Sequence, residues 1–204
     1  MKVFLTVLTL FLTLGIGFEG KSLAQQGSEE HRSITLLRPT VSGGMPLLEA
    51  INARRSDREF KKENLTEQQI ANLLWVAVGV NRAEEGNRRT TPTAMNKQDV
   101  SVYALNDSGA FHYDAIDHRL NIVELGDKTS VLNAPFSLIF VAPANNENAG
   151  LNVGFCSQNV YLYAASEGLN TVAKGTADRP ALKKLLKLSD DQQIVLVQPV
   201  GPRP

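Results

Sequence analysis

Three arginines and a serine stand within five positions of the chain, at Arg54, Arg55, Ser56 and Arg58. Clustered guanidinium groups suit a phosphate, because each offers N–H donors that can bind two oxygens at once. Ser56 adds a hydroxyl that can donate to the same group. If a helix continues through the cluster, Arg54 and Arg58 lie on one face, because they are four positions apart. The alternative is a solvated surface run that is paired with neighbouring carboxylates.

A second group of polar side chains follows in the long polar stretch of residues 81–98. Thr91, Thr93, Asn96 and Gln98 place hydrogen-bonding groups around a proline in this stretch. Amide side chains carry both donors and acceptors, so they can read the edge of a heteroaromatic ring. Long loops without regular structure are usually functional or disordered. The alternative is an ordinary polar loop.

Expected helices and strands must position these residues, and their mixture along the chain predicts an α+β fold. The clearest helix spans residues 64–80, with Thr66 and Gln69 as a capping box and Gly79 as the stop. Residues 151–169 predict a buried helix that closes at Gly168. The remaining expected elements are a helix over 46–53, a three-stranded meander over 100–105, 110–116 and 120–125, a buried strand over 134–143, a short strand over 170–174, a helix over 178–188 and a last strand over 192–201.

The N-terminus resembles a secretory signal peptide. Lys2 precedes an apolar run over residues 3–17, and a small-x-small site ends at Ala24. The alternative is a membrane anchor, but the run is shorter than the roughly 20 residues that a spanning helix needs. We therefore expect cleavage of residues 1–24, a secreted or periplasmic protein, and no stable membrane anchor afterwards. Residues 25–44 are then expected to form a flexible arm, and residues 45–204 a single domain.

Several classes of function are disfavoured. The formal net charge is zero, so nucleic acid is not an expected partner. The single cysteine, Cys156, lies in an apolar run and is expected to be a buried, inert thiol. The three histidines lack metal-binding spacing, so we expect no metal site. His112 lies within an expected strand, where a structural role is favoured over a catalytic one.

Several blocks along the chain, in this order, resemble the nitroreductase superfamily of flavin proteins. They read "ARRSDREF", "LLWVAVGVN", "RRTTPTAMNKQDVSVYAL", "GFCSQNVYLYAASEGLNTV" and "PVG", and they cover the chain from about residue 45 to its end. Within that superfamily the chain looks closest to the SagB/ThcOx-type branch of thiazole and oxazole dehydrogenases. The resemblance implies an intertwined homodimer with a central mixed or antiparallel sheet flanked by helices. It also implies FMN at the interface between the two subunits.

The resemblance also assigns roles to individual residues. Arg54, Arg55 and Ser56 would reach the FMN phosphate and ribityl chain, and Arg58 would approach the N1/O2 side of the ring. The partner subunit would supply the loop that contains Pro92, Thr93, Ala94, Met95 and Asn96, with the Asn96 side chain hydrogen-bonded to the ring.

Further contacts are implied outside these two blocks. Gln98 would support the ribityl chain, and Gln158, with Asn159, would pack towards the site from the buried helix. Lys174 and Gly175 would lie over the ring and present a backbone N–H near N5. Relatives often supply a basic residue to the phosphate from a further C-terminal segment, and Arg203 is the candidate here.

The resemblance implies an exported FMN-dependent oxidoreductase that transfers hydride between flavin N5 and a small organic substrate. Nicotinamide donors are scarce outside the cytoplasm, so we expect direct substrate oxidation or an electron-transfer partner. The lysine–tyrosine pair of azoline-oxidising enzymes is missing, which leaves Lys174 as the candidate catalytic base. An alternative is a flavin-binding or interaction module with little or no turnover.

Overall fold

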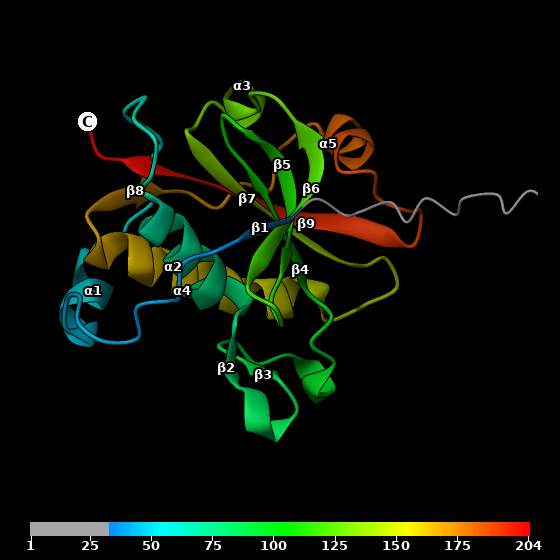
Figure 1. The fold of residues 1–204 in the computed structure, drawn as a ribbon, viewed down its shortest axis with the longest axis horizontal. Helices are drawn as coiled ribbons and strands as arrows, with labels where there is room; N and C mark the ends of the chain where they lie inside the picture. Colours follow the sequence, from blue (N-terminus) through cyan, green and yellow to red (C-terminus); the bar gives the residue numbers. More distant parts are fainter. Residues whose placement is uncertain (1–32) are drawn as a thin grey trace, which may run out of the picture. The chain divides into compact units, whose positions relative to one another are not determined.

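The computed structural model describes residues 33–204, which form a seven-stranded sheet with helices on both faces (Figure 1). The strand order is β1-β6-β5-β4-β7-β9-β8, and each neighbouring pair is antiparallel. The strands are β1 (Ser33–Thr35), β4 (Ser101–Leu105), β5 (Gly109–Asp114), β6 (Arg119–Leu125), β7 (Phe136–Pro143), β8 (Leu169–Thr171) and β9 (Gln192–Pro202). The expected α+β class and the meander of β4, β5 and β6 are confirmed.

Alternating side chains divide the core between the two faces of the sheet. In β4, Val102 and Ala104 face one helical layer, while Tyr103 and Leu105 face the other. The first layer contains α2 (Glu67–Val78) and α4 (Ala149–Ser166), and α1 (Leu47–Ala53) packs against α4. The second contains α3 (Thr129–Leu132) and α5 (Arg179–Leu185).

Helix α2 begins at the expected capping box. The hydroxyl of Thr66 accepts from the backbone N–H of Gln69 at 3.1 Å, and the Gln69 side chain accepts from the Thr66 N–H at 3.0 Å. The helix ends at Gly79, where a side chain would collide with the Trp75 indole. Gly79 has φ −67°, so this glycine is favoured by lack of space and not by a left-handed turn.

The stretch predicted as a flexible arm includes an edge strand. Ser33–Thr35 pair with β6, and the Leu36 N–H donates to the His118 carbonyl at 3.2 Å. Leu36 also packs against the core. The ordered domain therefore begins before residue 45. The sequence gives little sign of this strand, because its three side chains are all exposed and show no alternation.

The long stretch over residues 81–98 also contains more structure than expected. It includes a small hairpin of β2 (Val80–Arg82) and β3 (Arg88–Arg89). Two single turns of 3₁₀ helix lie within the same stretch, at Ala83–Glu85 between the two strands and at Ala94–Asn96 after them. Tertiary contacts order this segment, as described below.

The predicted signal peptide, residues 1–24, lies outside the described residues. Within residues 33–204, no helix combines the length and the apolar character needed to cross a membrane.

Candidate functional site

The arginine cluster begins where α1 ends. The helix stops at Ala53, and Arg54 has φ −60° and ψ 125°, which is extended backbone. The expected end of this helix at residue 53 is therefore confirmed, and the condition under which Arg54 and Arg58 would share one helical face is not met. Pro46 begins the helix, but its seven residues bury only Ala50, so packing gives little reason to extend it.

The cluster is held instead as an extended segment beside the end of the sheet. The Asp57 N–H donates to the Thr171 carbonyl at 3.0 Å. The Asn170 side chain donates to the Glu59 carbonyl at 2.8 Å. Further along, the Lys61 N–H donates to the carbonyl of Pro202, the last residue of β9, at 3.0 Å. These bonds fix the backbone while leaving Arg55, Ser56 and Arg58 exposed.

Tyr161 of α4 joins Arg54 and Ser56. Its hydroxyl oxygen lies 2.8 Å from the Ser56 Oγ and 2.8 Å from the backbone nitrogen of Ala173. The Arg54 guanidinium lies over its ring, 5.3 Å from the centroid, at a cation–π distance. One buried tyrosine thus brings together two residues of the cluster and the segment that follows β8.

Positive charge is in excess at this end of α4. Arg55 pairs with Asp57 at 2.6 Å, but Arg55 is 65% exposed, and such a pair contributes little stability. Within the described chain, Arg54 and Arg58 have no ion pair. Arg203 lines the same narrow cleft as Arg55 and Asp57, and its buried Nε has no partner there. The alternative of an ion-paired surface run thus accounts for Arg55 alone.

The segment after β8 alters one expected contact. The Lys174 N–H donates to the Val197 carbonyl at 2.8 Å, and the Val197 N–H donates back at 3.2 Å. The Lys174 N–H is therefore engaged with the sheet, which leaves the N–H of the exposed Gly175 as the one for the expected contact with a flavin ring. That contact stays a prediction.

The polar loop has an unusual backbone. Met95, Asn96 and Gln98 have φ of +55°, +52° and +50°, in the left-handed region that non-glycine residues seldom adopt. Pro92, Met95 and Asn96 are exposed, whereas the neighbouring Thr93 is half-buried. Such a conformation persists only where surrounding contacts hold it.

Those contacts come from α4 and from the loop itself. Asn152 is fully buried, and its side-chain oxygen accepts from the Ala94 N–H at 2.9 Å. The Thr93 hydroxyl accepts from the Gln98 N–H at 2.8 Å. The Thr91 hydroxyl donates to the Ala77 carbonyl of α2 at 3.2 Å. The loop is thus built onto the N-terminal end of α4.

The loop and the arginine cluster do not meet within one chain. Asn152 anchors the loop and Tyr161 anchors the cluster, and they are nine residues apart in α4. At about 1.5 Å per residue, this separates them by roughly 14 Å along the helix axis. Gln158 lies between them on the exposed side of α4, and Asn159 donates to the Val76 carbonyl of α2 at 3.0 Å. The expected packing of these two side chains towards the site stays a prediction.

The outer side of α4 and the neighbouring α1 expose large apolar side chains. On α4, Leu151 is 55% exposed and Phe155 is 38% exposed. On α1, Leu47, Leu48 and Ile51 are each at least half exposed. No described element of the chain covers this surface, which lies alongside both groups of candidate site residues.

The prediction that Cys156 is a buried thiol is confirmed. The residue has no exposed surface, and burial raises the pKa of its thiol to about 11. Its sulfur lies 3.5 Å from the Thr91 hydroxyl and donates to the Asn152 carbonyl at 3.3 Å.

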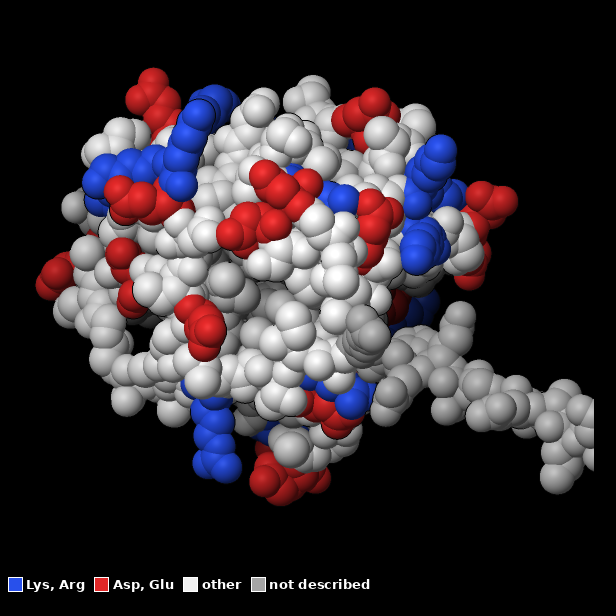
Figure 2. All heavy atoms as spheres, turned by 45° about the horizontal axis from the view of Figure 1, so that its top comes forward, with Lys and Arg blue, Asp and Glu red and all other residues white. Residues whose placement is uncertain are grey.

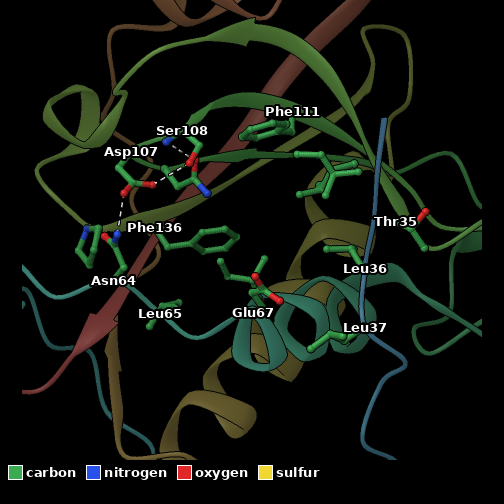
Figure 3. Close-up of a pocket in the computed structure, with 15 residues that line it drawn as sticks. Thr35, Leu36, Leu37, Asn64, Leu65, Glu67, Asp107, Ser108, Phe111 and Phe136 are labelled. Carbon is green, nitrogen blue, oxygen red and sulfur yellow. Dashed lines mark hydrogen bonds between the residues drawn. The ribbon is translucent and has the colours of Figure 1, made fainter. Parts of the chain in front are cut away.

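A larger pocket lies elsewhere and has the wrong character for an anion. It has a volume of about 470 Å³ and is lined by residues of the N-terminal strand, the start of α2 and the turn between β4 and β5 (Figure 3). Its charged lining residues are Glu67 and Asp107, and the Asn64 side chain donates to Asp107 at 2.6 Å. Because carboxylates repel phosphate, the arginine cluster is the better candidate site.

The side of the molecule that Figure 2 shows has no extended patch of one charge, because basic and acidic side chains are interspersed over it. Among the described residues, no group of three or more His, Cys, Asp or Glu side chains is placed to hold a metal ion.

Sequence reasoning missed Tyr161, Asn152 and Ala173. Each lies in or after the apolar α4 region, where the pattern predicts only burial. Their roles depend on which distant backbone atoms they reach, and no local signal reveals that.

Both the sequence and the fold resemble those of known proteins. The family model described as "Nitroreductase family" matches residues 51–202. A nitroreductase candidate from Methanocaldococcus jannaschii is 29% identical in an alignment of 177 residues, with 72% of this chain and 86% of that protein covered. The crystal structure of a nitroreductase candidate from Ralstonia eutropha JMP134 has 32% identity and a TM-score of 0.78, with 87% of this chain and 92% of that chain covered.

A more distant match shows likeness of fold alone. A chain of the Escherichia coli microcin synthetase McbBCD complex has 18% identity and a TM-score of 0.61, with 96% of this chain and 85% of that chain covered.

Proposed function

Since the chain belongs to the nitroreductase family of oxidoreductases, we propose that it is an exported FMN-dependent enzyme that transfers hydride between flavin N5 and a small organic substrate. The observation that carries this proposal is the excess of hydrogen-bond donors around Tyr161. Arg54, Ser56 and Arg203 offer donors that lack carboxylate partners in the described chain. A phosphate, which only accepts hydrogen bonds when ionised, fits that set.

The chain's own residues would bind and orient the cofactor. Arg54, Ser56 and Arg203 would hold the phosphate, and Arg58 would place positive charge beside the ring. A cation at that place favours the reduced, anionic state of a flavin. Bound FMN would supply the redox chemistry, while the protein supplies position and charge.

We further propose that each site is built from two chains. The loop with Asn96 and the cluster with Arg54 lie roughly 14 Å apart along α4, at about 1.5 Å per residue. A second chain that packs its α4 in the opposite direction would bring its loop to the first chain's cluster. The exposed apolar surface of α1 and α4 supplies a face for that contact.

Mixed dimers test the composite site. One chain carries Arg54→Ala and the other carries Asn152→Ala, and the two are tagged differently so that hybrids can be isolated. In a composite arrangement, one site of the hybrid receives both lesions and the other receives none. The hybrid should therefore bind about one FMN per dimer with wild-type affinity. Hybrids that bind no better than either homodimer would place both halves of the site in one chain.

The cofactor itself is tested on the purified full-length protein. Visible absorption before and after heat release should show about one FMN per chain. A protein that is colourless and takes up no added FMN would contradict the proposal.

We also propose the SagB/ThcOx-type dehydrogenase branch and a periplasmic or secreted location. The resemblance in sequence supports the branch, and the N-terminal apolar run supports export. Nicotinamide donors are scarce outside the cytoplasm, so NADPH should reduce the bound flavin slowly. Rapid bleaching on addition of NADPH would contradict the branch, and recovery of the uncleaved chain in the cytoplasm would contradict export.

A module with little turnover is the second candidate. One observation favours it, because the Lys174 N–H expected near the reacting atom is engaged with Val197. Bound FMN that no donor other than dithionite reduces would support this candidate over the enzyme.

A further inference from the structure

The hydroxyl of Tyr161 makes two close contacts that define its hydrogen-bonding role. The backbone nitrogen of Ala173 lies 2.8 Å away on one side, and the Ser56 Oγ lies 2.8 Å away on the other. A backbone N–H can only donate, so the Tyr161 oxygen accepts from Ala173. This leaves the tyrosine's own hydrogen for the second contact.

Burial then decides the direction of that second bond. Tyr161 is only 9% exposed, and a buried O–H without an acceptor is destabilising. Among the described residues, the acceptor within reach of this hydrogen is the Ser56 Oγ. Tyr161 therefore donates to Ser56.

The consequence falls on Ser56. Its oxygen accepts from Tyr161, so its own hydrogen is free to donate elsewhere. Ser56 is exposed and next to Arg54, and within the described chain its hydroxyl has no further partner. The hydroxyl is thus set as a donor to an acceptor on a ligand. An ionised phosphate ester presents acceptors in every orientation and meets this requirement, whereas an N–H group of a ligand at the same place does not.

The same tyrosine also holds Arg54. The guanidinium lies over the ring, 5.3 Å from its centroid, and is only half-buried. Removing the ring would disturb Arg54, whereas removing the hydroxyl alone would not. The two effects can be separated by substitution.

We propose that Tyr161 is a positioning residue that fixes the Ser56 hydroxyl as a hydrogen-bond donor and so selects an anionic phosphate ester. This inference rests on the proposed function, because the phosphate is that of FMN. Tyr161 acts through Ser56 and does not touch the ligand.

The test compares FMN with riboflavin, which lacks the phosphate. The full-length protein is prepared as wild type, Tyr161→Phe, Ser56→Ala and the double variant, and the dissociation constants of both flavins are measured by fluorescence quenching. Tyr163→Phe is the matched control. Its hydroxyl lies on the same helix but is bonded to the Asn72 side chain at 3.2 Å, towards α2.

Tyr161→Phe and Ser56→Ala should each weaken FMN binding by about tenfold or more, as expected for one hydrogen bond to a charged group. The double variant should be no weaker than Ser56→Ala, because both changes remove the same donor. Riboflavin binding should stay within about twofold of wild type in every variant, as should FMN binding to Tyr163→Phe, because neither the ring nor Arg54 changes.

Two results would overturn the positioning role while leaving the proposed function intact. One is additive loss in the double variant, and the other is equal loss of FMN and riboflavin in Tyr161→Phe. A wild type that binds neither flavin removes the proposed function and this inference with it.

A second pair of variants decides the matter if Tyr161→Phe does not fold. Ser56→Ala leaves the buried Tyr161 O–H without an acceptor, whereas Ser56→Thr keeps one. The flavin-free melting temperature of Ser56→Ala should therefore lie about 2–4 °C below that of Ser56→Thr, which corresponds to about one hydrogen bond in a domain of this size. Equal melting temperatures would show that Tyr161 does not donate to Ser56.

Discussion

The two ends of α4 carry site residues of opposite kinds. At its C-terminal end, Arg54 lies over the Tyr161 ring beside an ordinary extended backbone, and Arg203 lines the adjoining cleft. At its N-terminal end, Asn152 anchors a loop in which Met95 and Asn96 are held with positive φ. The first end offers side-chain charge, and the second offers a constrained backbone.

This difference separates binding from stability. At the charged end Arg55 and Arg58 are exposed, Arg54 and Arg203 are half-buried, and only Arg55 has an ion pair in the described chain, so these arginines contribute to affinity more than to folding. Asn152 at the other end is fully buried and satisfies a backbone N–H, so its loss affects folding first. Substitutions at the two ends should therefore give different signatures.

The largest effect is expected from Arg54→Ala, which removes a charged donor from the cluster. FMN affinity should fall by about 100-fold, the loss expected for a strong charge-assisted contact of about 3 kcal/mol. The flavin-free melting temperature should stay near that of wild type. Fluorescence titration and differential scanning fluorimetry measure the two quantities. Lys183→Ala, on the opposite face of the sheet, is the control, and an equal loss there would contradict a local effect.

The next effect should appear at the loop end. Asn152→Ala removes the acceptor of the Ala94 N–H inside the core, so the free energy of unfolding should fall by about 2 kcal/mol. Urea denaturation checks this value. Gln158→Ala on the exposed side of the same helix should change it by less than about 0.5 kcal/mol. An Asn152→Ala protein as stable as wild type would remove the contrast between the two ends.

Cys156 reports on the loop end alone, because its sulfur lies 3.5 Å from the Thr91 hydroxyl. Burial raises the pKa of this thiol to about 11, so iodoacetamide at pH 8 should label it slowly in the native protein. Asn152→Ala should speed labelling, while Arg54→Ala should leave the rate unchanged. Mass spectrometry of timed samples gives the rates. Equal acceleration by both substitutions would mean that the two ends are not independent.

A fall to mildly acidic pH should give the smallest loss of stability, and this loss should not depend on which end of α4 carries a substitution. Burial lowers the pKa of His118 below its ordinary value of about 6.5, so the unfolded chain takes up this proton first as the pH falls. The contribution of neutral His118 to the free energy of unfolding is therefore fully present above about pH 6.5, and it is lost as the pH falls towards the pKa of the folded state. His112 shows the same direction for the same reason.

Urea midpoints at pH 7.5 and pH 5.5 measure this loss. The His118 Nε2 donates to the Leu37 carbonyl at 2.8 Å, and Asn can adopt the left-handed backbone at this position, where φ is +49°. His118→Asn should flatten the dependence, whereas Arg54→Ala should keep the wild-type slope. If His118→Asn leaves the pH dependence of the urea midpoint unchanged, a group other than His118 causes the loss of stability.

The sequence predicts those parts of the fold that depend on local patterns. The capping box at Thr66 and the strand that became β4 need only a few neighbouring residues, and both are found. The arginine cluster was recognisable because charge density is also local. The end of α1 at Ala53 was predicted as well, but the course of the following segment was not, because it depends on bonds to Thr171 and Asn170.

Tyr161 and Asn152 mark the limit of such prediction for the site. In the sequence they are polar members of an apolar helix, and each reads as an ordinary core position. Their importance comes from partners far away in the chain, Ser56 for one and Ala94 for the other. Only the packing of α4 against both segments makes those contacts visible.

The packing of Gly201 has a practical consequence for protein engineering. A side chain at Gly201 would bring its Cβ within 2.8 Å of the Pro135 ring and 3.0 Å of the Phe60 Cβ, so the end of β9 is tightly fixed. Any affinity tag fused after Pro204 would start beside Arg203 and the arginine cluster. A polyhistidine or acidic tag at that position could compete with the cofactor, so recombinant versions intended for flavin titration should carry their tag elsewhere or have it removed.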